Sequence, residues 1–294
     1  MKNPLINTII LTILLYGSAL ANDGRKKEFE YSLDETYQIA DKGTLHLNTG
    51  DAAVKIIGSN RKDVHVNIYR KVTLKGIFRN NEENFKIVVS EKEGNLFIRE
   101  ESKSSISVAF GSYSETYKII IEVPATVSLN LHGDDDDYII KRINGTINIY
   151  GDDGDVEILS CRSKKITIDL KDGDVKIQAG RGSLIVDLDD GDLTANACDF
   201  TNMEIAVNDG YLDIETSLND KGAYHVGTDD GDVKIYITKG GGTFEVRHDD
   251  GRVRASSSFN NSFASERKHK FQLVGGRAQV FIKTNDGDVR LETN

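Results

Sequence analysis

Aspartate recurs at regular intervals in the second half of the chain, and its carboxylates are the side chains there that are best suited to bind a ligand. The dipeptide Asp-Gly occurs seven times between residues 153 and 287, and a second Asp follows most of these glycines. Clustered carboxylates suit Ca²⁺, which takes about six to eight oxygen ligands in a flexible geometry. The candidate calcium ligands are Asp153, Asp155, Asp172, Asp174, Asp190, Asp192, Asp230 and Asp232.

A second interpretation needs no metal. Aspartate beside a turn glycine accepts hydrogen bonds from nearby backbone amides, and its charge keeps the surface soluble. Neither the twelve-residue calcium loop nor the nine-residue calcium β-roll repeat occurs in the sequence. The pattern therefore favours turn formation, with calcium binding kept as a hypothesis.

The residues around each Asp-Gly predict the elements that position these carboxylates. Consecutive glycines of the motif are 19, 18, 19, 21, 20 and 36 residues apart. Apolar residues alternate with polar ones on both sides of the turn, as Ile147 and Ile149 do before Gly154 and Val156 and Ile158 do after it. A period of two indicates strands with one buried face.

Two architectures fit such a unit. Asp-Gly is a strong hairpin signal, which would give antiparallel strands in a meander or sandwich. Alternatively, each unit is one coil of a β-solenoid, stacked about 4.8 Å above the previous one. A solenoid folds the apolar face onto itself, whereas an open meander would leave it uncovered. We therefore expect an all-β protein, a β-solenoid of roughly 19-residue coils over residues 126–294.

Two cysteines test this geometry. Cys161 and Cys198 each stand seven residues after a motif glycine, with one unit between them. Two coils of separation put them about 10 Å apart, beyond the roughly 7 Å Cα separation that a disulfide tolerates. We expect two free thiols that face inward.

The first half of the mature chain, residues 22–125, is also β but irregular, and we expect it to cap the solenoid. Residues 45–56 resemble a first, imperfect unit, and residues 85–90 and 96–99 flank a hairpin turn at Glu93-Gly94-Asn95. Residues 102–114 are polar and are interpreted as a loop. Residues 256–270 are interpreted as an inserted loop or a degenerate unit.

The N-terminus predicts export. Lys2 precedes an apolar run over Leu5–Tyr16, and Gly17–Ala21 supplies the small residues that a signal peptidase reads. We expect residues 1–21 to be a signal peptide, with no transmembrane segment after cleavage. The mature protein would be periplasmic, or secreted to the cell surface.

Charge and motifs narrow the function. The formal net charge of −10 argues against nucleic acid as a partner. No nucleophile elbow, zinc-binding helix motif, phosphate-binding loop or dinucleotide fingerprint occurs. We therefore expect a non-enzymatic protein.

The enzyme alternative is a polysaccharide-cleaving β-helix, since such enzymes use clustered carboxylates. The six histidines are not spaced as metal ligands are. In the alternating pattern, His248 stands at a position that is expected to face the core, which is typical of a structural residue.

The strand Tyr117–Pro124, the segment Val127–Leu131 and the repeated turns resemble the bacterial "putative adhesin" domain of unknown function, over about Leu45–Asn294. The resemblance implies a β-solenoid, an envelope location and adhesin-like binding or a structural role. The partner would be an envelope or extracellular protein or glycan. The chain departs from the pattern at His132–Asp137, and at Tyr211 and Arg252, which replace the Asp after the glycine.

Overall fold

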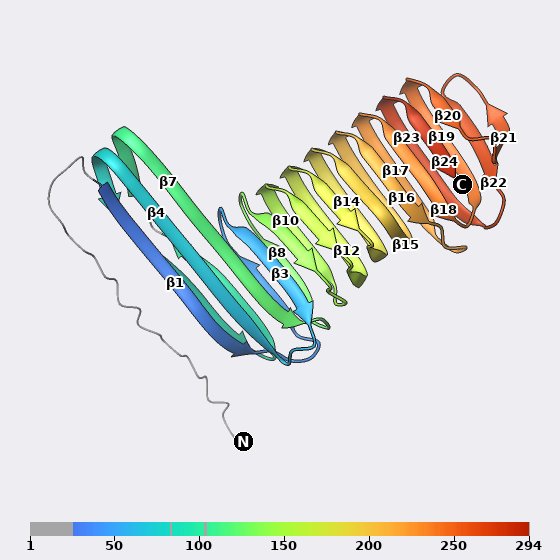
Figure 1. Cartoon of the computed structure of the whole chain (residues 1–294). Coiled ribbons are helices and arrows are strands. Elements are labelled where there is room, and N and C mark those ends of the chain that lie inside the picture. The colour runs from blue at the N-terminus through green and yellow to red at the C-terminus, as the bar shows by residue number, and fades with distance from the viewer. Residues whose placement is uncertain (1–25, 83, 103–104, 294) are drawn as a thin grey trace.

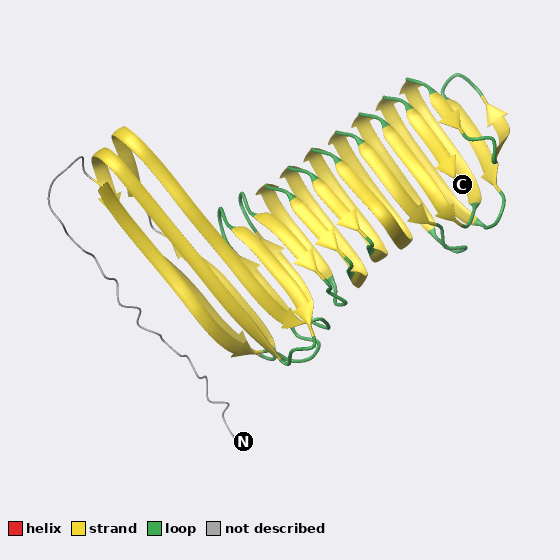
Figure 2. Cartoon of the chain, in the orientation of Figure 1, coloured by secondary structure: helices red, strands yellow, loops and turns green. Residues whose placement is uncertain are grey.

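Every regular element in the described part of the chain is a β-strand. The structure is a computed structural model that describes residues 26–82, 84–102 and 105–293 (Figures 1 and 2). The predicted all-β class is confirmed, and the predicted signal peptide lies outside the described residues. No helix in those residues is long and apolar enough to cross a membrane.

The central part of the chain is a stack of two-stranded coils. In each coil, one strand runs up to the Asp-Gly corner and the next strand leads away from it. The central strands are β8 (Ser128–His132), β9 (Asp137–Lys141), β10 (Ile147–Asp153), β11 (Val156–Leu159), β12 (Arg162–Asp172), β13 (Val175–Gln178), β14 (Arg181–Asp190), β15 (Leu193–Asp209), β16 (Leu212–Ser217), β17 (Ala223–Asp230) and β18 (Val233–Lys239).

Strands of successive coils pair in parallel. β10 pairs with β8 and β12, which all precede a corner, whereas β11 pairs with β9 and β13, which all follow one. The first set forms what we call the pre-turn face, and the second set forms the post-turn face. β15 belongs to both, because it begins on the post-turn face and ends on the pre-turn face. Parallel pairing confirms the solenoid and rules out the hairpin meander.

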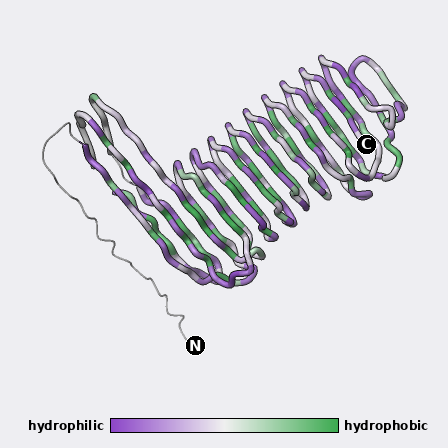
Figure 3. The backbone as a smooth tube through the Cα atoms, viewed as in Figure 1, coloured by the Kyte–Doolittle hydropathy of each residue, from purple (hydrophilic) through white to green (hydrophobic). Residues whose placement is uncertain are grey.

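The core is built from columns of equivalent apolar side chains. Ile147 pairs with Ile166, and Ile166 pairs with Leu184, and all three are fully buried. Each such side chain contributes about 1.5–3 kcal/mol when it leaves water. Figure 3 shows the resulting alternation of hydrophobic and hydrophilic positions along the strands.

The two cysteines lie in this core. Cys161 and Cys198 are both buried and free, which confirms the expected inward-facing thiols. Burial raises the pKa of the Cys161 thiol and raises that of Cys198 to about 11. Both thiols are therefore protonated at neutral pH, which makes them poor nucleophiles.

Glycine is required at the corner for two reasons. Gly173 and Gly191 both have a φ of +137°, which residues with a Cβ rarely adopt. In addition, a Cβ on Gly173 would lie 2.2 Å from the carbonyl oxygen of Gly154, and one on Gly191 would lie 2.2 Å from that of Gly173. The corners of successive coils therefore stack backbone on backbone, with no room for a side chain.

A folded ribbon closes the N-terminal end of the stack. β4 pairs antiparallel with β7, and β5 pairs antiparallel with β6, so these four strands form one long hairpin. Within the ribbon, Gly76 pairs with Gly111, and both have positive φ. The strands at this end are β1 (Lys26–Gln38), β2 (Thr44–Asn48), β3 (Ala53–Ser59), β4 (Asp63–Glu82), β5 (Phe85–Lys92), β6 (Asn95–Ser102) and β7 (Ser105–Pro124).

The first coil lies between the ribbon and the central stack. β2 pairs in parallel with β6 on one side and β8 on the other, and β3 does the same with β7 and β9. Two expectations are confirmed, since residues 45–56 form a coil and the hairpin turn lies at Glu93-Gly94. The interpretation of residues 102–114 as a loop is wrong. Residues 105–114 belong to β7, where pairing with β4 holds them extended.

At the C-terminal end, the coils are not stacked in the order in which they occur in the sequence. β23 lies between β17 and β19, and β24 lies between β18 and β20, so the last coil in the sequence is the penultimate coil in space (Figure 1). Residues 256–270 hold most of the hairpin β21–β22, which pairs antiparallel with β19 and covers the end of the pre-turn face. The strands are β19 (Gly242–Asp250), β20 (Val253–Ala255), β21 (Phe259–Ala264), β22 (Lys268–Leu273), β23 (Ala278–Asp286) and β24 (Val289–Thr293).

The corner geometry predicts that Gly173→Ala destabilises the stack by more than about 1 kcal/mol, because the new Cβ meets a carbonyl oxygen in a strained backbone region. Gly227→Ala is the matched control, since its Cβ would meet no atom closer than 3.7 Å. Urea unfolding followed by circular dichroism measures both. Equal midpoints for the two variants would contradict the stacking requirement.

Candidate functional site

The eight predicted metal ligands form two neighbouring columns along the corner edge. Asp153 pairs with Asp172, and Asp172 pairs with Asp190, so the residues before the glycines stack in register. The residues after the glycines form the second column, which contains Asp155, Asp174, Asp192 and Asp232. The structure thus brings the predicted ligands to one edge.

The second column is a ladder of hydrogen bonds between coils. The amide of Asp174 donates to Oδ1 of Asp155 at 2.9 Å, and the amide of Asp192 donates to Oδ1 of Asp174 at 3.1 Å. The same bond joins Asp155 to Asp137 at 3.0 Å and Asp288 to Asp232 at 2.7 Å. These carboxylates therefore have a structural use that repeats from coil to coil.

In the first column, neighbouring carboxylates repel one another. The pKa of Asp153 is raised, first by desolvation and then by the charges of Asp135 and Asp172. Across the described residues, no three His, Cys, Asp or Glu side chains are grouped so that they could hold a metal ion. Calcium binding at the eight carboxylates stays a prediction.

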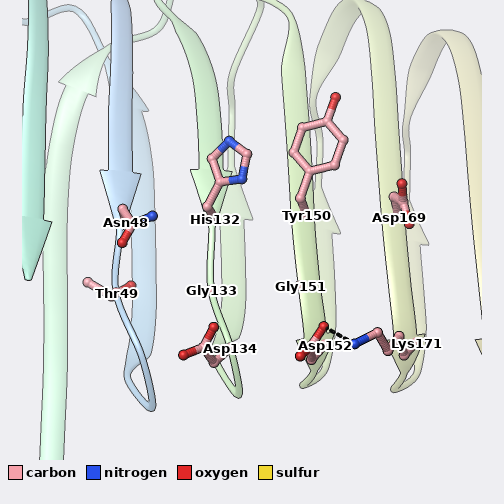
Figure 4. Close-up of a pocket in the computed structure, with 10 residues that line it drawn as sticks. All are labelled: Asn48, Thr49, His132, Gly133, Asp134, Tyr150, Gly151, Asp152, Asp169 and Lys171. Carbon is pink, nitrogen blue, oxygen red and sulfur yellow. Dashed lines mark ion pairs between the residues drawn. The ribbon is translucent and has the colours of Figure 1, made fainter.

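A different site lies on the pre-turn face, where the ribbon meets the first coils. Two adjoining hollows of about 450 and 400 Å³ share Asn48 and His132, so together they form one groove, here called the ring groove. Figure 4 shows the first of the two hollows. The first hollow is lined by Asn48, Thr49, His132, Gly133, Asp134, Tyr150, Gly151, Asp152, Asp169 and Lys171. The second is lined by His46, Leu47, Asn48, Val88, Ser90, Lys92, Phe97, Ile98, Arg99, Asn130 and His132.

Two pairs of stacked rings line this groove. The rings of His46 and Phe97 are parallel within 3°, with centroids 4.3 Å apart. Those of His132 and Tyr150 lie within 15° of parallel at 5.0 Å. All four residues occupy outward positions of neighbouring strands, in the order β6, β2, β8 and β10. The strand pairing itself therefore sets the ring spacing.

Polar groups surround the rings. The amide Nδ2 of Asn130 lies 3.2 Å from Nδ1 of His46, and Nζ of Lys171 pairs with Asp152 at 2.6 Å (Figure 4). Desolvation, and secondarily the charge of His132, lowers the pKa of His46. Its imidazole is thus neutral at neutral pH, with one nitrogen to donate and one to accept a hydrogen bond. The groove combines flat rings with donors and acceptors.

The comparison with protein families covers most of these elements. Residues 43–292 match the family described as Toastrack DUF4097. The chain belongs to the Toastrack family. The match includes the coils of the central stack, the ring groove and the C-terminal hairpin. No curated protein matched the chain.

Solved structures with similarity to this Toastrack chain share little sequence with it. A "putative adhesin" from Bacteroides fragilis NCTC 9343 is 14% identical with a TM-score of 0.37, over 88% of this chain and 96% of the other. A "putative lipid binding protein" from Parabacteroides distasonis ATCC 8503 is 15% identical with a TM-score of 0.37, over 89% and 97%. A "putative cell adhesion protein" from Clostridium sporogenes ATCC 15579 is 13% identical with a TM-score of 0.24, over 91% and 100%.

In this Toastrack member, a buried carboxylate holds the corner beneath the groove. Asp136 accepts hydrogen bonds from the Thr49 hydroxyl, from the Ala52 amide at 2.6 Å and from the Tyr138 hydroxyl at 2.9 Å. It is only 2% exposed, and desolvation raises its pKa to about 6 in spite of these bonds. Because Thr49 lines the groove, Asp136 fixes part of the groove wall.

Sequence reasoning missed the ring groove. His46 and His132 showed no ligand spacing along the chain, because only the parallel pairing of β2 and β8 brings them to the same groove. One signal was available, since both stand at outward positions of strands that precede a corner. His248 lies inward as expected, 7% exposed and stacked on His269 at 5.4 Å.

The burial of Asp136 predicts a pH dependence that Asp136→Asn removes. Between pH 3.8 and about 6, the folded state keeps a proton that the unfolded chain has lost, so this group lowers stability as pH rises through that window. The loss is on the order of 3 kcal/mol. Urea unfolding at pH 4 and pH 7 measures it as the difference between wild type and variant. A difference that does not change with pH would contradict the buried ionisation.

The calcium hypothesis predicts a higher melting temperature in millimolar CaCl₂ than in EDTA, because a ligand that binds only the folded state stabilises it. Asp174→Asn and Asp192→Asn together should abolish that increase. Identical melting temperatures for the wild type in the two buffers would leave the hydrogen-bond ladder as the sole role of these residues.

Proposed function

We propose that the protein is a non-enzymatic, adhesin-like binding protein of the bacterial envelope, and that the ring groove contacts a glycan. The two pairs of stacked rings on an exposed sheet face carry this proposal. The envelope location rests on the signal peptide expected over residues 1–21. Membership of the Toastrack family is compatible with this role.

The chemistry of the groove suits a sugar. A sugar ring has a C–H face, which packs on the negative face of an aromatic ring, and a rim of hydroxyl groups. Tyr150 and Phe97 supply such faces, and Asn48, Asn130 and neutral His46 supply partners for hydroxyls. The groove is open to solvent rather than enclosed, which suits a polymer that continues beyond the site.

Hydrolysis of the glycan is less well supported. A glycosidase needs one carboxylate pair set apart from all others by its position and pKa. In this chain, the corner carboxylates repeat from coil to coil, and several accept the same amide hydrogen bond. Of the carboxylates in the groove, Asp152 is paired with Lys171. We therefore assign binding rather than cleavage.

The proposal predicts that His132→Ala with Tyr150→Ala weakens glycan binding about tenfold or more, because flat rings at the centre of an interface carry much of the binding energy. An array of immobilised bacterial polysaccharides, probed with the full mature chain, provides the measurement. Tyr211→Ala is the matched control, since Tyr211 is 38% exposed but lies on the corner edge. Full binding by the double variant, or no glycan bound by the wild type, would refute the proposal.

A further inference from the structure

A second group of rings and charges lies at the other end of the pre-turn face. Arg247, Lys268 and Lys270 all contact the carboxylate of Glu245, at 2.7, 2.9 and 3.2 Å. Lys283 stands beside Arg247 on the paired strand. We call these four basic residues the cationic patch.

The patch has more positive charge than its own acid can neutralise. Contacts with Lys268 and Arg247 lower the pKa of Glu245 to about 2, so it is ionised at neutral pH. One carboxylate then faces three cations, and Lys283 adds a fourth on the neighbouring strand. Nearby Asp249 lies 3.6 Å from Arg267 and is balanced by it. In a chain of net charge −10, this is a local field that attracts anions.

An aromatic ring adjoins the cations. Phe281 lies opposite Glu245 in the strand pairing, and the guanidinium carbon of Arg247 is 5.4 Å from its ring centroid. The His225 ring lies 6.2 Å away on its other side. The patch therefore pairs a flat ring with hydrogen-bond donors, as the ring groove does, but with positive charge added.

Strand pairing places both sites in the same two outward columns. His46 and Phe281 belong to one column, and His132 and Lys283 belong to the other. Tyr150 on β10 and His225 on β17 are four strand steps apart, about 19 Å along the stack. A linear ligand that lies across the strands would meet both sites.

Acidic side chains on the strands between the two sites restrict where a bound ligand can carry negative charge. Asp169, Asp187 and Glu204 occupy the same outward columns on β12, β14 and β15. These carboxylates repel an anion, whereas the cationic patch attracts one. A ligand that reaches both sites thus has its acidic group at the C-terminal end of the stack.

From this geometry we infer that the cationic patch is a second glycan subsite that takes an acidic sugar. The inference rests on the proposed function, because it makes the patch a continuation of the ring groove. The anionic group, a carboxylate or a phosphate ester, sits among Arg247, Lys268, Lys270 and Lys283, and the sugar ring packs on Phe281.

The test compares acidic oligogalacturonate with its methyl-esterified form, which has the same length without the charge. We expect the wild-type chain to bind the acid more tightly, and Lys268→Gln with Lys270→Gln to weaken binding of the acid about tenfold, with a smaller effect of salt in the variant. The matched control is Lys55→Gln with Lys141→Gln on the post-turn face, which should bind the acid as the wild type does. Calorimetry at two salt concentrations measures each affinity.

Equal affinity of the wild type for the two forms, or of the Lys268/Lys270 variant and the wild type for the acid, would overturn the inference. So would patch-dependent binding of phosphatidylglycerol vesicles without binding of the acidic oligosaccharide, which would make the patch a lipid contact. A third outcome separates the two proposals. If the patch variant loses binding of the acid, while His132→Ala with Tyr150→Ala changes binding of neither the acid nor its methyl ester, the acidic subsite is supported and only the role of the ring groove is contradicted.

Discussion

Close contact between successive backbones at the Asp-Gly corner governs the rest of the structure. The position that a Cβ would take on Gly173, Gly191 or Gly231 lies only 2.0–2.2 Å from a carbonyl oxygen of the neighbouring coil. Such contact fixes the vertical register of the strands on both sides of the corner. Since strand side chains alternate, a slip of one residue would turn every buried column outward. The glycine column therefore specifies the core as well as the turn.

The same corner explains the aspartates that follow the glycines. Two carboxylates about 5 Å apart repel by roughly 0.8 kcal/mol in water, yet each accepts an amide hydrogen bond from the neighbouring coil, which stabilises the corner. The exceptions fit this role. Tyr211 lacks a carboxylate but still donates its amide to Asp192 at 2.8 Å. Arg252 lies in the last coil, where no further amide needs an acceptor, and its guanidinium pairs with Asp288 at 3.1 Å.

The repeat could be predicted from sequence because its signals are local. The alternation around each glycine gave the strands, the burial of Ile147 and its equivalents, and the inward cysteines. The spatial order of the coils at the two ends could not be predicted. Any coil can pair in parallel with any equivalent coil, so the sequence pattern does not say which coils are neighbours. The ring groove was missed for that reason, since it requires β2 to lie between β6 and β8. The strand over residues 105–114 was missed because pairing with β4, a contact distant in sequence, holds it extended.

A regular stack offers the same surface at every coil, so a specific site requires a place where the repeat is broken. The inward columns and the corner are fixed by stacking, which leaves the outward positions free to vary. Both ring clusters lie where spatial order departs from chain order: His46 belongs to the coil inserted between β6 and β8, and Phe281 to the coil inserted between β17 and β19. Insertion brings together side chains that are distant in sequence and follow no repeat. The same departures that close the two ends of the stack thus create its two distinctive surfaces.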